Sequence, residues 1–201
     1  MLQTCALVHT NFGENVEKQF KHQKPTDELG ALAYGAAMVA RMYPNYALFA
    51  ELTESSDQQV FANILNLVWE YIGGKNQRID FHKQQDKLEA ITPDPEAFDF
   101  YGVWPAMDAT VALGSLLAAC ELWDADEIDA IELVSLSTIG HYLDVMEEVG
   151  DDSPLYDAEE DYQQALWKAI EHHKNSRTQL VAAVRNVVKE RVVSNIGLEA
   201  G

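Results

Sequence analysis

The six histidines are the residues of this 201-residue chain whose spacing could first indicate metal chemistry. A di-iron or di-manganese helix bundle needs Glu-x-x-His motifs, because this spacing places both ligands on one face of a helix. No histidine here has Asp or Glu three residues before it. His82 with Asp86 and His141 with Asp144 have the spacing of helical neighbours, but each pair supplies two of the four ligands that a tetrahedral metal site needs. The sequence therefore predicts no metal site and no cofactor.

Motifs of covalent catalysis are missing from the sequence as well. The chain has no Gly-x-Ser-x-Gly elbow, no glycine-rich phosphate loop and no dinucleotide fingerprint. His141 lies in the middle of an expected helix near acidic residues, a setting similar to that of the phosphoacceptor histidine in phosphotransfer domains. Those domains continue with a basic, glycine-containing stretch, whereas residues 142–146 here are YLDVM. We therefore interpret His141 as a packed or surface residue and predict no catalytic residue.

Three charged residues in otherwise apolar stretches are the strongest candidates for a polar site. Arg41 ends a nearly uncharged segment, Glu70 lies in a strongly apolar run, and Asp108 is the lone charge of an apolar helix expected to begin at Pro105. Because a buried unpaired charge costs several kcal/mol, they predict a partly buried network. It is either an Arg–carboxylate clamp between helices or a site with a catalytic carboxylate. Since free amides and the helix dipole favour an anion at a helix start, we favour Asp108 as a helix-start anion clamped by Arg41.

Aromatic residues gather in two segments, before and around the prolines at positions 44 and 105. They are Tyr43, Tyr46, Phe100, Tyr101 and Trp104. If their rings are exposed, they form a surface for a protein partner or for self-association. If they are buried, they are core residues, which is the usual place for aromatic residues near helix starts.

The elements that must position these residues are helices, because apolar residues recur with helical spacing and no stretch alternates convincingly over five or more residues. Pro44 is expected to end one helix and to begin a short one. Residues after 159 are expected to form one long, unbroken helix. The sequence thus predicts an all-α, single-domain bundle of six to eight helices over residues 1–201. The expected helices span about residues 15–22, 26–42, 45–52, 57–72, 80–90, 105–120, 125–149 and 159–192.

The composition narrows the class of protein. With 33 acidic and 14 basic residues, the net charge is −19, which repels phosphate backbones and anionic lipid, so we expect no nucleic-acid and no membrane partner. The longest uncharged apolar runs, 30–40 and 109–120, are short of the roughly 20 residues needed to cross a bilayer. The distant Cys5 and Cys120 fit no metal or redox-motif spacing and indicate reduced thiols, with Cys120 in the core. We predict a cytoplasmic protein.

Several strings of the sequence resemble a known family. They are RMYPNY at 41–46, LVWE at 67–70, FDFYGVWPAMDA at 98–109 and SNIG at 194–197. In order and spacing these strings resemble the YjaG-like family of bacterial all-helical proteins of unknown function. The resemblance extends from about residue 29 to 197, and residues 1–28 and 151–161 match least. It implies a cytoplasmic all-α fold and no established catalytic residues, and genomic neighbourhood associates the family with histidine-kinase signalling.

Two classes of function follow from these observations. The leading hypothesis is a non-enzymatic regulatory or interaction module, linked through the resemblance to histidine-kinase signalling, with a protein partner or a homodimer. The alternative is a small-molecule-binding protein or an enzyme with a site around Arg41, Glu70 and Asp108, which requires these three residues to line one accessible pocket.

Overall fold

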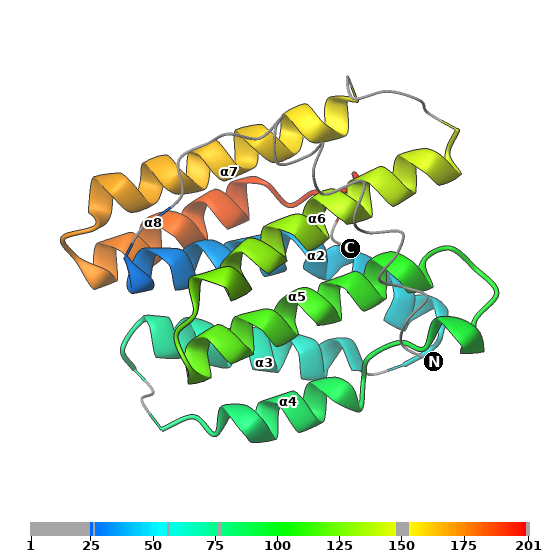
Figure 1. Ribbon diagram of the computed structural model, residues 1–201, viewed down its shortest axis with the longest axis horizontal. Helices are drawn as coiled ribbons and strands as arrows, with labels where there is room; N and C mark the ends of the chain where they lie inside the picture. The colour runs from blue at the N-terminus through cyan, green and yellow to red at the C-terminus, as the bar shows by residue number, and fades with distance from the viewer. Residues whose placement is uncertain (1–24, 26, 56, 76–77, 148–152, 200–201) are drawn as a thin grey trace.

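The structure is a computed structural model that describes residues 25, 27–55, 57–75, 78–147 and 153–199. Within these ranges the chain is all-α, which confirms the predicted fold class (Figure 1). The expected helix at residues 15–22 lies outside the described residues, and the extent of a single domain over 1–201 stays a prediction. The α-helices are α2 (Glu28–Leu52), α3 (Asp57–Ile72), α4 (Phe81–Glu89), α5 (Val103–Glu121), α6 (Ala125–Val145), α7 (Pro154–His173) and α8 (Arg177–Glu190), with a 3-10 turn η1 (Pro95–Ala97) before α5.

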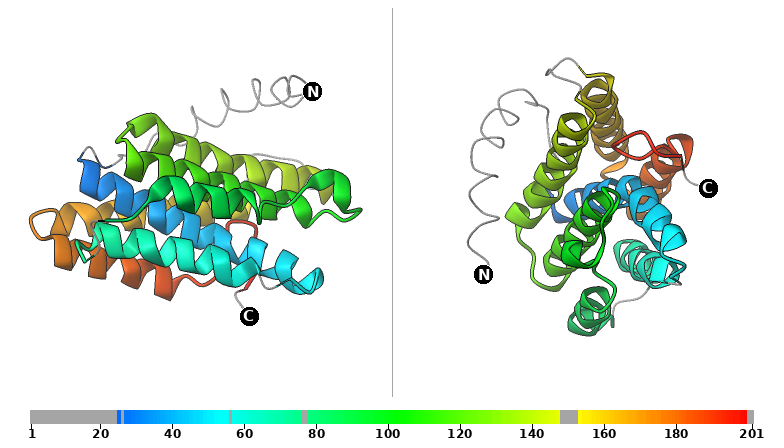
Figure 2. Two further views of the ribbon diagram at one scale, coloured as in Figure 1. Left: turned by 90° about the horizontal axis from the view of Figure 1, so that it is seen from below. Right: turned by 90° about the vertical axis from the view of Figure 1, so that its right-hand side faces the viewer.

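Helix α2 is the central helix of the bundle. It packs against α3, α5, α6, α7 and α8, and the end-on view shows it among them (Figure 2). Alanine and glycine residues on several sides of α2 let neighbouring helices approach closely. A Cβ atom at Gly35 would lie 3.0 Å from Ile128 and 3.3 Å from Leu116, so a larger residue would push α5 and α6 away. The expectation that Gly35 permits close helix contact is confirmed.

Pro44 lies inside α2, so the prediction that one helix ends before it and another begins there is wrong. A proline within a helix removes one backbone hydrogen bond and crowds the preceding turn. Residues on both sides of Pro44 are buried, including Met42 and Tyr46. Their burial offsets the missing bond, since burying an apolar side chain contributes roughly 1.5–3 kcal/mol.

The amphipathic helices follow their sequence pattern. The stripe predicted for α3 is buried throughout and consists of Phe61, Ile64, Leu65, Val68 and Ile72. Asp80 caps α4 by accepting a hydrogen bond from the backbone N–H of Lys83 at 2.9 Å, and Asp124 caps α6 in the same way through Asp126.

Helix α5 is the most apolar helix of the bundle. By length and composition alone it is the one described helix that could cross a membrane, but 61% of its apolar window is buried inside the protein. Burial of this kind is typical of the core helix of a soluble protein. Cys120 near its end is buried, and burial raises the pKa of the thiol to about 12, so the thiol stays protonated.

The C-terminal helix is not the unbroken element expected from residue 159 to 192. Ser153 caps α7 so that it begins already at Pro154, and a turn at Lys174–Ser176 separates α7 from α8. A single helix of that length would extend about 50 Å, beyond the rest of the bundle. The turn instead folds α8 back along α7, where Leu180 and Val184 become fully buried.

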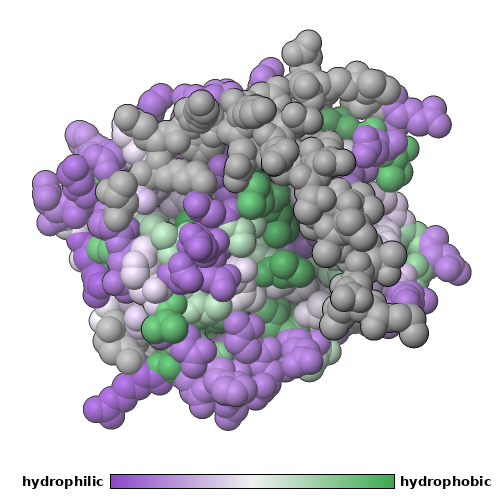
Figure 3. Space-filling model, in the orientation of Figure 1, coloured by the Kyte–Doolittle hydropathy of each residue, from purple (hydrophilic) through white to green (hydrophobic). Residues whose placement is uncertain are grey.

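The surface of the bundle is largely hydrophilic, in keeping with the net charge of −19. On the face in Figure 3, hydrophobic side chains show in the middle, with hydrophilic residues to the left and below. Exposed apolar residues of α5 and α6 include Val111 and Leu133. At the right-hand end in Figure 1, α2 ends, α5 begins and α6 ends, so these three termini lie at the same end of the bundle.

Candidate functional site

The segment after α8 forms a compact turn that lies against the helices. Val193 and Glu199 form an isolated antiparallel bridge. Between them, the Ser194 hydroxyl accepts hydrogen bonds from the backbone N–H groups of Ile196 and Leu198 at 3.3 and 3.1 Å. Gly197 has φ +84°, a left-handed conformation that glycine adopts at little cost. We call residues 193–199 the C-terminal segment.

Asn195 anchors this segment to two helices. Its side-chain amide donates to the carbonyl oxygen of Ser135 on α6 at 3.0 Å and to the Ser135 hydroxyl at 3.2 Å. Its side-chain oxygen accepts a hydrogen bond from Nδ2 of Asn45 on α2 at 2.9 Å. All three residues are buried, so these bonds form away from water, where an unpaired group would cost about 1–3 kcal/mol.

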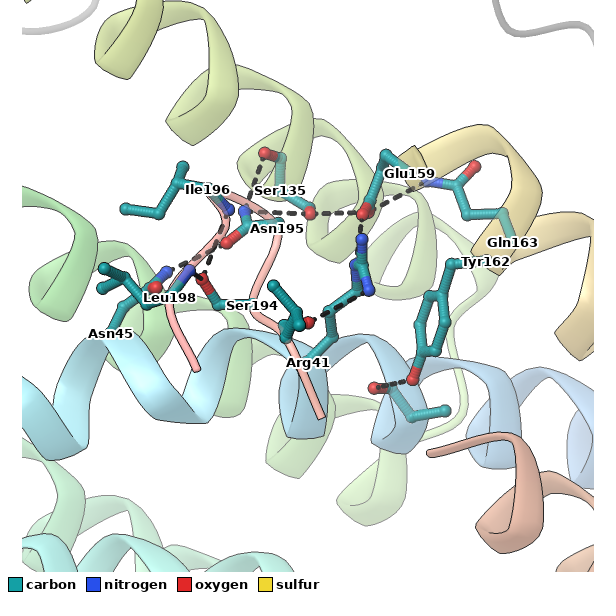
Figure 4. A network of polar contacts seen from close by, with 12 residues as sticks. Arg41, Asn45, Ser135, Glu159, Tyr162, Gln163, Ser194, Asn195, Ile196 and Leu198 are labelled. Atoms are coloured by element: carbon teal, nitrogen blue, oxygen red, sulfur yellow. Dashed lines mark hydrogen bonds and ion pairs between the residues drawn. The ribbon is translucent and has the colours of Figure 1, made fainter. Parts of the chain in front are cut away.

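Arg41 and Glu159 form a buried ion pair beside Asn195 (Figure 4). Arg41 Nε donates to Glu159 Oε2 at 2.6 Å, and Nη1 donates to the carbonyl oxygen of Val193 at 3.1 Å. The guanidinium lies 4.5 Å from the ring centre of Tyr162. The other oxygen of Glu159 accepts a hydrogen bond from the Ser135 hydroxyl at 2.8 Å. Arg41 is 7% and Glu159 0% exposed, so the pair ties α2, α6, α7 and the C-terminal segment together.

An apolar pocket of about 140 Å³ lies next to this network. The last turns of α2 form one wall, the residues at the start of α5 form a second, and the C-terminal segment forms a third. We call it the α2–α5 pocket. Its lining residues on α2, α5 and α6 are Asn45, Leu48, Phe49, Leu52, Pro105 and Tyr142, those of the turn before α5 are Tyr101 and Gly102, and those of the C-terminal segment are Ile196 and Leu198.

Two oxygen atoms of residues lining the α2–α5 pocket have no hydrogen-bond partner among the described residues. They are Asn45 Oδ1 and the hydroxyl oxygen of Tyr101, and both atoms are buried. The Asn45 side chain is 2% exposed and points from α2 toward the C-terminal segment, beside Leu198 (Figure 4). Burial, with a smaller contribution from Asp108, raises the pKa of Tyr101, which keeps its phenol protonated at neutral pH. Buried polar atoms normally have partners, so this pair marks the pocket as a place for a ligand.

A second hollow of about 280 Å³ lies between the end of α2 and the loop before η1. Its polar groups already have partners. Thr53 and Thr92 donate to backbone carbonyls of the preceding turn, and Asp94 accepts from the backbone N–H of Glu96. These hydrogen bonds stabilise the ends of helices, so these groups of the hollow have a structural role in capping.

The three charged residues singled out in the sequence have different environments. Arg41 takes part in an Arg–carboxylate clamp between helices, but the carboxylate is Glu159. Glu70 is exposed on α3, so its expected partial burial is wrong. Asp108 is partly buried and accepts a hydrogen bond from Thr138 on α6 at 2.8 Å. Because α5 begins at Val103, Asp108 lies beyond the first turn, and its interpretation as a helix-start anion is wrong.

The aromatic candidates divide between core and surface. Tyr46 is fully buried and donates to the carbonyl oxygen of Ile91 at 2.9 Å. Tyr43 is partly buried, with its ring 5.4 Å from that of Phe61. Trp104 is 45% exposed and Phe100 is also exposed. Of the residues named as binding candidates, Tyr101 is the one that lines the α2–α5 pocket.

Sequence reasoning did not single out Asn45, Glu159 or Asn195 as site residues. Glu159 lies in an acidic run that reads as a solvated surface. Asn45 and Asn195, however, lie within RMYPNY and SNIG, two of the strings that carry the family resemblance. The structure brings these two strings together with Tyr101 and Pro105 of a third string. Membership in one of these strings was therefore the sequence feature that could have identified Asn45 and Asn195 as site residues.

Comparisons with known proteins agree with this resemblance. Residues 18–199 match the family described as "Protein of unknown function (DUF416)". An uncharacterized protein of Haemophilus influenzae is 36% identical over 178 residues, 84% of this chain and 90% of that protein. The uncharacterized protein YjaG of Escherichia coli K12 is 30% identical over 176 residues, 83% of this chain and 89% of that protein. The similarity to a YjaG-like family is confirmed.

A solved structure supports the fold in the same way. The crystal structure of a DUF416 family protein from Shewanella baltica OS155, at 1.91 Å resolution, superimposes with a TM-score of 0.80 and 30% sequence identity. The match covers 94% of this chain and 99% of that one.

Proposed function

This chain belongs to the DUF416 family, whose function is unknown, and we propose that it is a non-enzymatic regulatory module that binds a small, largely apolar ligand in the α2–α5 pocket. One observation carries the proposal: among the residues that line an apolar pocket of about 140 Å³, two carry a buried oxygen with no partner in the described part of the chain. Protein cavities of about 150 Å³ accept molecules the size of benzene. The size of the pocket therefore sets the size of the ligand.

The residues that line the α2–α5 pocket are suited to binding a ligand rather than to catalysing a reaction. The described lining residues provide an amide, two phenols and apolar side chains, with no carboxylate, imidazole or thiol. Arg41 and Glu159 are nearby, but they bond to each other in the interior. The alternative of an enzyme site around Arg41, Glu70 and Asp108 has weaker support, because Arg41 is buried in an ion pair while Glu70 is exposed. The absence of a cofactor and the association with histidine-kinase signalling stay predictions.

The regulatory part of the proposal rests on the wall that the C-terminal segment contributes. Ile196 and Leu198 line the pocket, and the same segment is held by Arg41 and Asn45. A ligand that binds only when this wall is in place stabilises the segment by mass action. Ligand binding would then make residues 193–199 more ordered, and a protein partner that contacts this segment could distinguish the bound from the free state.

Binding of toluene to the full chain tests the proposal. We expect saturable shifts of amide signals from the residues that line the pocket, and slower hydrogen exchange in residues 193–199. Leu48→Trp places a larger side chain at the pocket and should weaken toluene binding at least tenfold. Val111→Trp is the matched control, because Val111 is also an exposed apolar helix residue but lies outside the pocket lining. If both variants bind toluene equally, or if the chain binds no neutral molecule of this size, the proposal is wrong.

A homodimer is a second candidate, favoured by apolar side chains exposed at the same end of the bundle. Leu52 is 61% exposed, and Leu48, Phe100 and Trp104 are exposed as well. Several apolar side chains exposed at one end of a bundle are typical of association surfaces. Light scattering should show a dimer that Leu52→Asp dissociates, with Leu122→Asp as the control at another exposed leucine. A monomer at all protein concentrations would rule out the homodimer.

A further inference from the structure

The hydrogen bonds around Asn45, a residue that lines the α2–α5 pocket, determine which end of its amide is left unpaired. Asn195 must present Nδ2 to the carbonyl of Ser135, because a carbonyl can only accept. Asn195 Oδ1 is therefore an acceptor, and Asn45 must present its own Nδ2 to it. The end of Asn45 that remains without a partner is Oδ1, which can only accept a hydrogen bond. A ligand that satisfies Asn45 must carry a donor.

The Tyr101 hydroxyl sets a second requirement. Its oxygen is buried without a partner, and burial keeps the group protonated, so it can donate to a ligand and also accept from it. A hydroxyl group on the ligand can donate to Asn45 and accept from Tyr101. A hydroxyl is the smallest uncharged oxygen group that provides a donor and an acceptor on the same atom.

The charge of the ligand follows from the surroundings. An anion would lose its hydration in an apolar pocket and would lie near Asp108 and Asp144, which both act electrostatically on Tyr101. A cation would need a carboxylate in the lining, and the described lining residues provide none. A neutral molecule avoids both the loss of hydration of an ion and the need for an opposite charge in the lining. The larger hollow near η1 is a weaker candidate, because Thr53, Thr92 and Asp94 there are already hydrogen-bonded.

We propose that the α2–α5 pocket binds a small neutral alcohol or phenol, whose apolar body fills the cavity while its hydroxyl donates to Asn45 Oδ1 and accepts from Tyr101. This inference rests on the proposed function, since it specifies the ligand of the same pocket. The apolar body lies against Leu48, Phe49 and Pro105 from the helices and Ile196 from the C-terminal segment.

Phenol and toluene, titrated separately into the full chain and followed by amide chemical shifts, test the inference. The two molecules have nearly the same size, and an entirely apolar pocket favours toluene because phenol must give up its hydrogen bonds to water. We expect the reverse order, with phenol binding at least fivefold more tightly, because each hydrogen bond regained in the pocket contributes about fivefold. Tighter or equal binding of toluene would overturn the inference and leave the proposed function standing. Binding of neither probe would overturn both.

Variants of Tyr101 and Asn45 test whether their oxygen atoms cause the preference for phenol over toluene. Tyr101→Phe should reduce phenol binding about fivefold and leave toluene binding unchanged. Tyr142→Phe is the matched control, because Tyr142 also lines the pocket but its hydroxyl is not one of the buried unpartnered atoms. Asn45→Leu should abolish the preference for phenol. If this variant fails to fold because Asn195 loses its partner, the Tyr101 variant still decides the outcome. A phenol-to-toluene ratio that Tyr101→Phe does not change would overturn the role of Tyr101.

Discussion

The network around Arg41 and the α2–α5 pocket lie side by side and share Asn45 and the C-terminal segment, but they differ in how their main polar groups are paired. Gln163, which donates to Glu159 in the network, also has a buried oxygen without a partner among the described residues, so the contrast concerns the charged groups of the network. In the network, the charged groups of Arg41 and Glu159 meet each other and find further partners at Val193 and Ser135. In the pocket, Asn45 Oδ1 and the Tyr101 hydroxyl have no partner.

The difference shows why a buried charge is a poor guide to a binding site in this bundle. An ion pair with complete partners has little left to offer a ligand, whereas a neutral oxygen without a partner gains the full value of a new hydrogen bond. The network is therefore expected to determine stability, and the pocket is expected to determine binding. The predictions that follow test this division.

The largest effect is expected from breaking the ion pair. Arg41→Met leaves Glu159 as an unpaired carboxylate in the interior, so the free energy of unfolding should fall by about 3–5 kcal/mol. Adding Glu159→Met should recover a large part of this loss, because the double variant buries no charge. Urea unfolding of both single variants and the double variant provides the coupling free energy.

The exposed pair of Lys174 and Glu171 is the control for that experiment. Its atoms are 2.9 Å apart, but Lys174 is half exposed, so solvent screens the pair and Lys174→Met should cost far less than Arg41→Met. If the losses at Arg41 and Glu159 simply add, the two residues do not act as a pair and the network is not the clamp described here.

An intermediate effect is expected at Asn195. Asn195→Ala removes the hydrogen bonds to Ser135 and Asn45, so the free energy of unfolding should fall by about 2 kcal/mol. Hydrogen exchange should become faster in residues 193–199 before it changes in α2. Glu199→Ala, at an exposed position of the same segment, is the control and should have little effect. Unchanged exchange in the segment would show that Asn195 does not anchor it.

The sequence predicted the helices far better than it predicted their contacts. The helix expected at residues 57–72 matches α3, because its apolar stripe recurs at a local spacing that periodicity detects. Pro44 was misread because the burial that keeps it inside α2 comes from other helices. The turn at Lys174–Ser176 was missed because helical spacing continues on both sides of it.

The candidate site was predictable in part for the same reason. Arg41 was identified as half of a clamp, since a charge in an apolar segment needs a partner. Its partner, Glu159, lies 118 residues away in the sequence, and its own neighbours are acidic. No local rule separates it from the solvated acids around it. Asn45 and Asn195 carry no charge, so the same argument could not reveal them.

A smaller effect is expected at Tyr162, a buried tyrosine of the network. Its hydroxyl donates to the carbonyl oxygen of Ala37 at 2.8 Å, and its ring lies against Arg41. Tyr162→Phe keeps the ring and removes the hydrogen bond, so the free energy of unfolding should fall by about 1 kcal/mol in urea unfolding. An unchanged free energy of unfolding would mean that this hydrogen bond contributes little to the stability of the core.

The smallest effect, and the one that separates the two regions most clearly, is expected from the same substitution at Tyr101. Tyr101→Phe removes a buried hydroxyl that has no partner, so the free energy of unfolding should stay unchanged or rise by up to about 1 kcal/mol. Phenol has the opposite effect, because a ligand stabilises the folded chain by an amount that grows with the logarithm of its affinity. Wild type should therefore gain more stability from phenol than the variant. A loss equal to that of Tyr162→Phe in ligand-free protein would show that the Tyr101 hydroxyl already has a partner, and the contrast between network and pocket would fail.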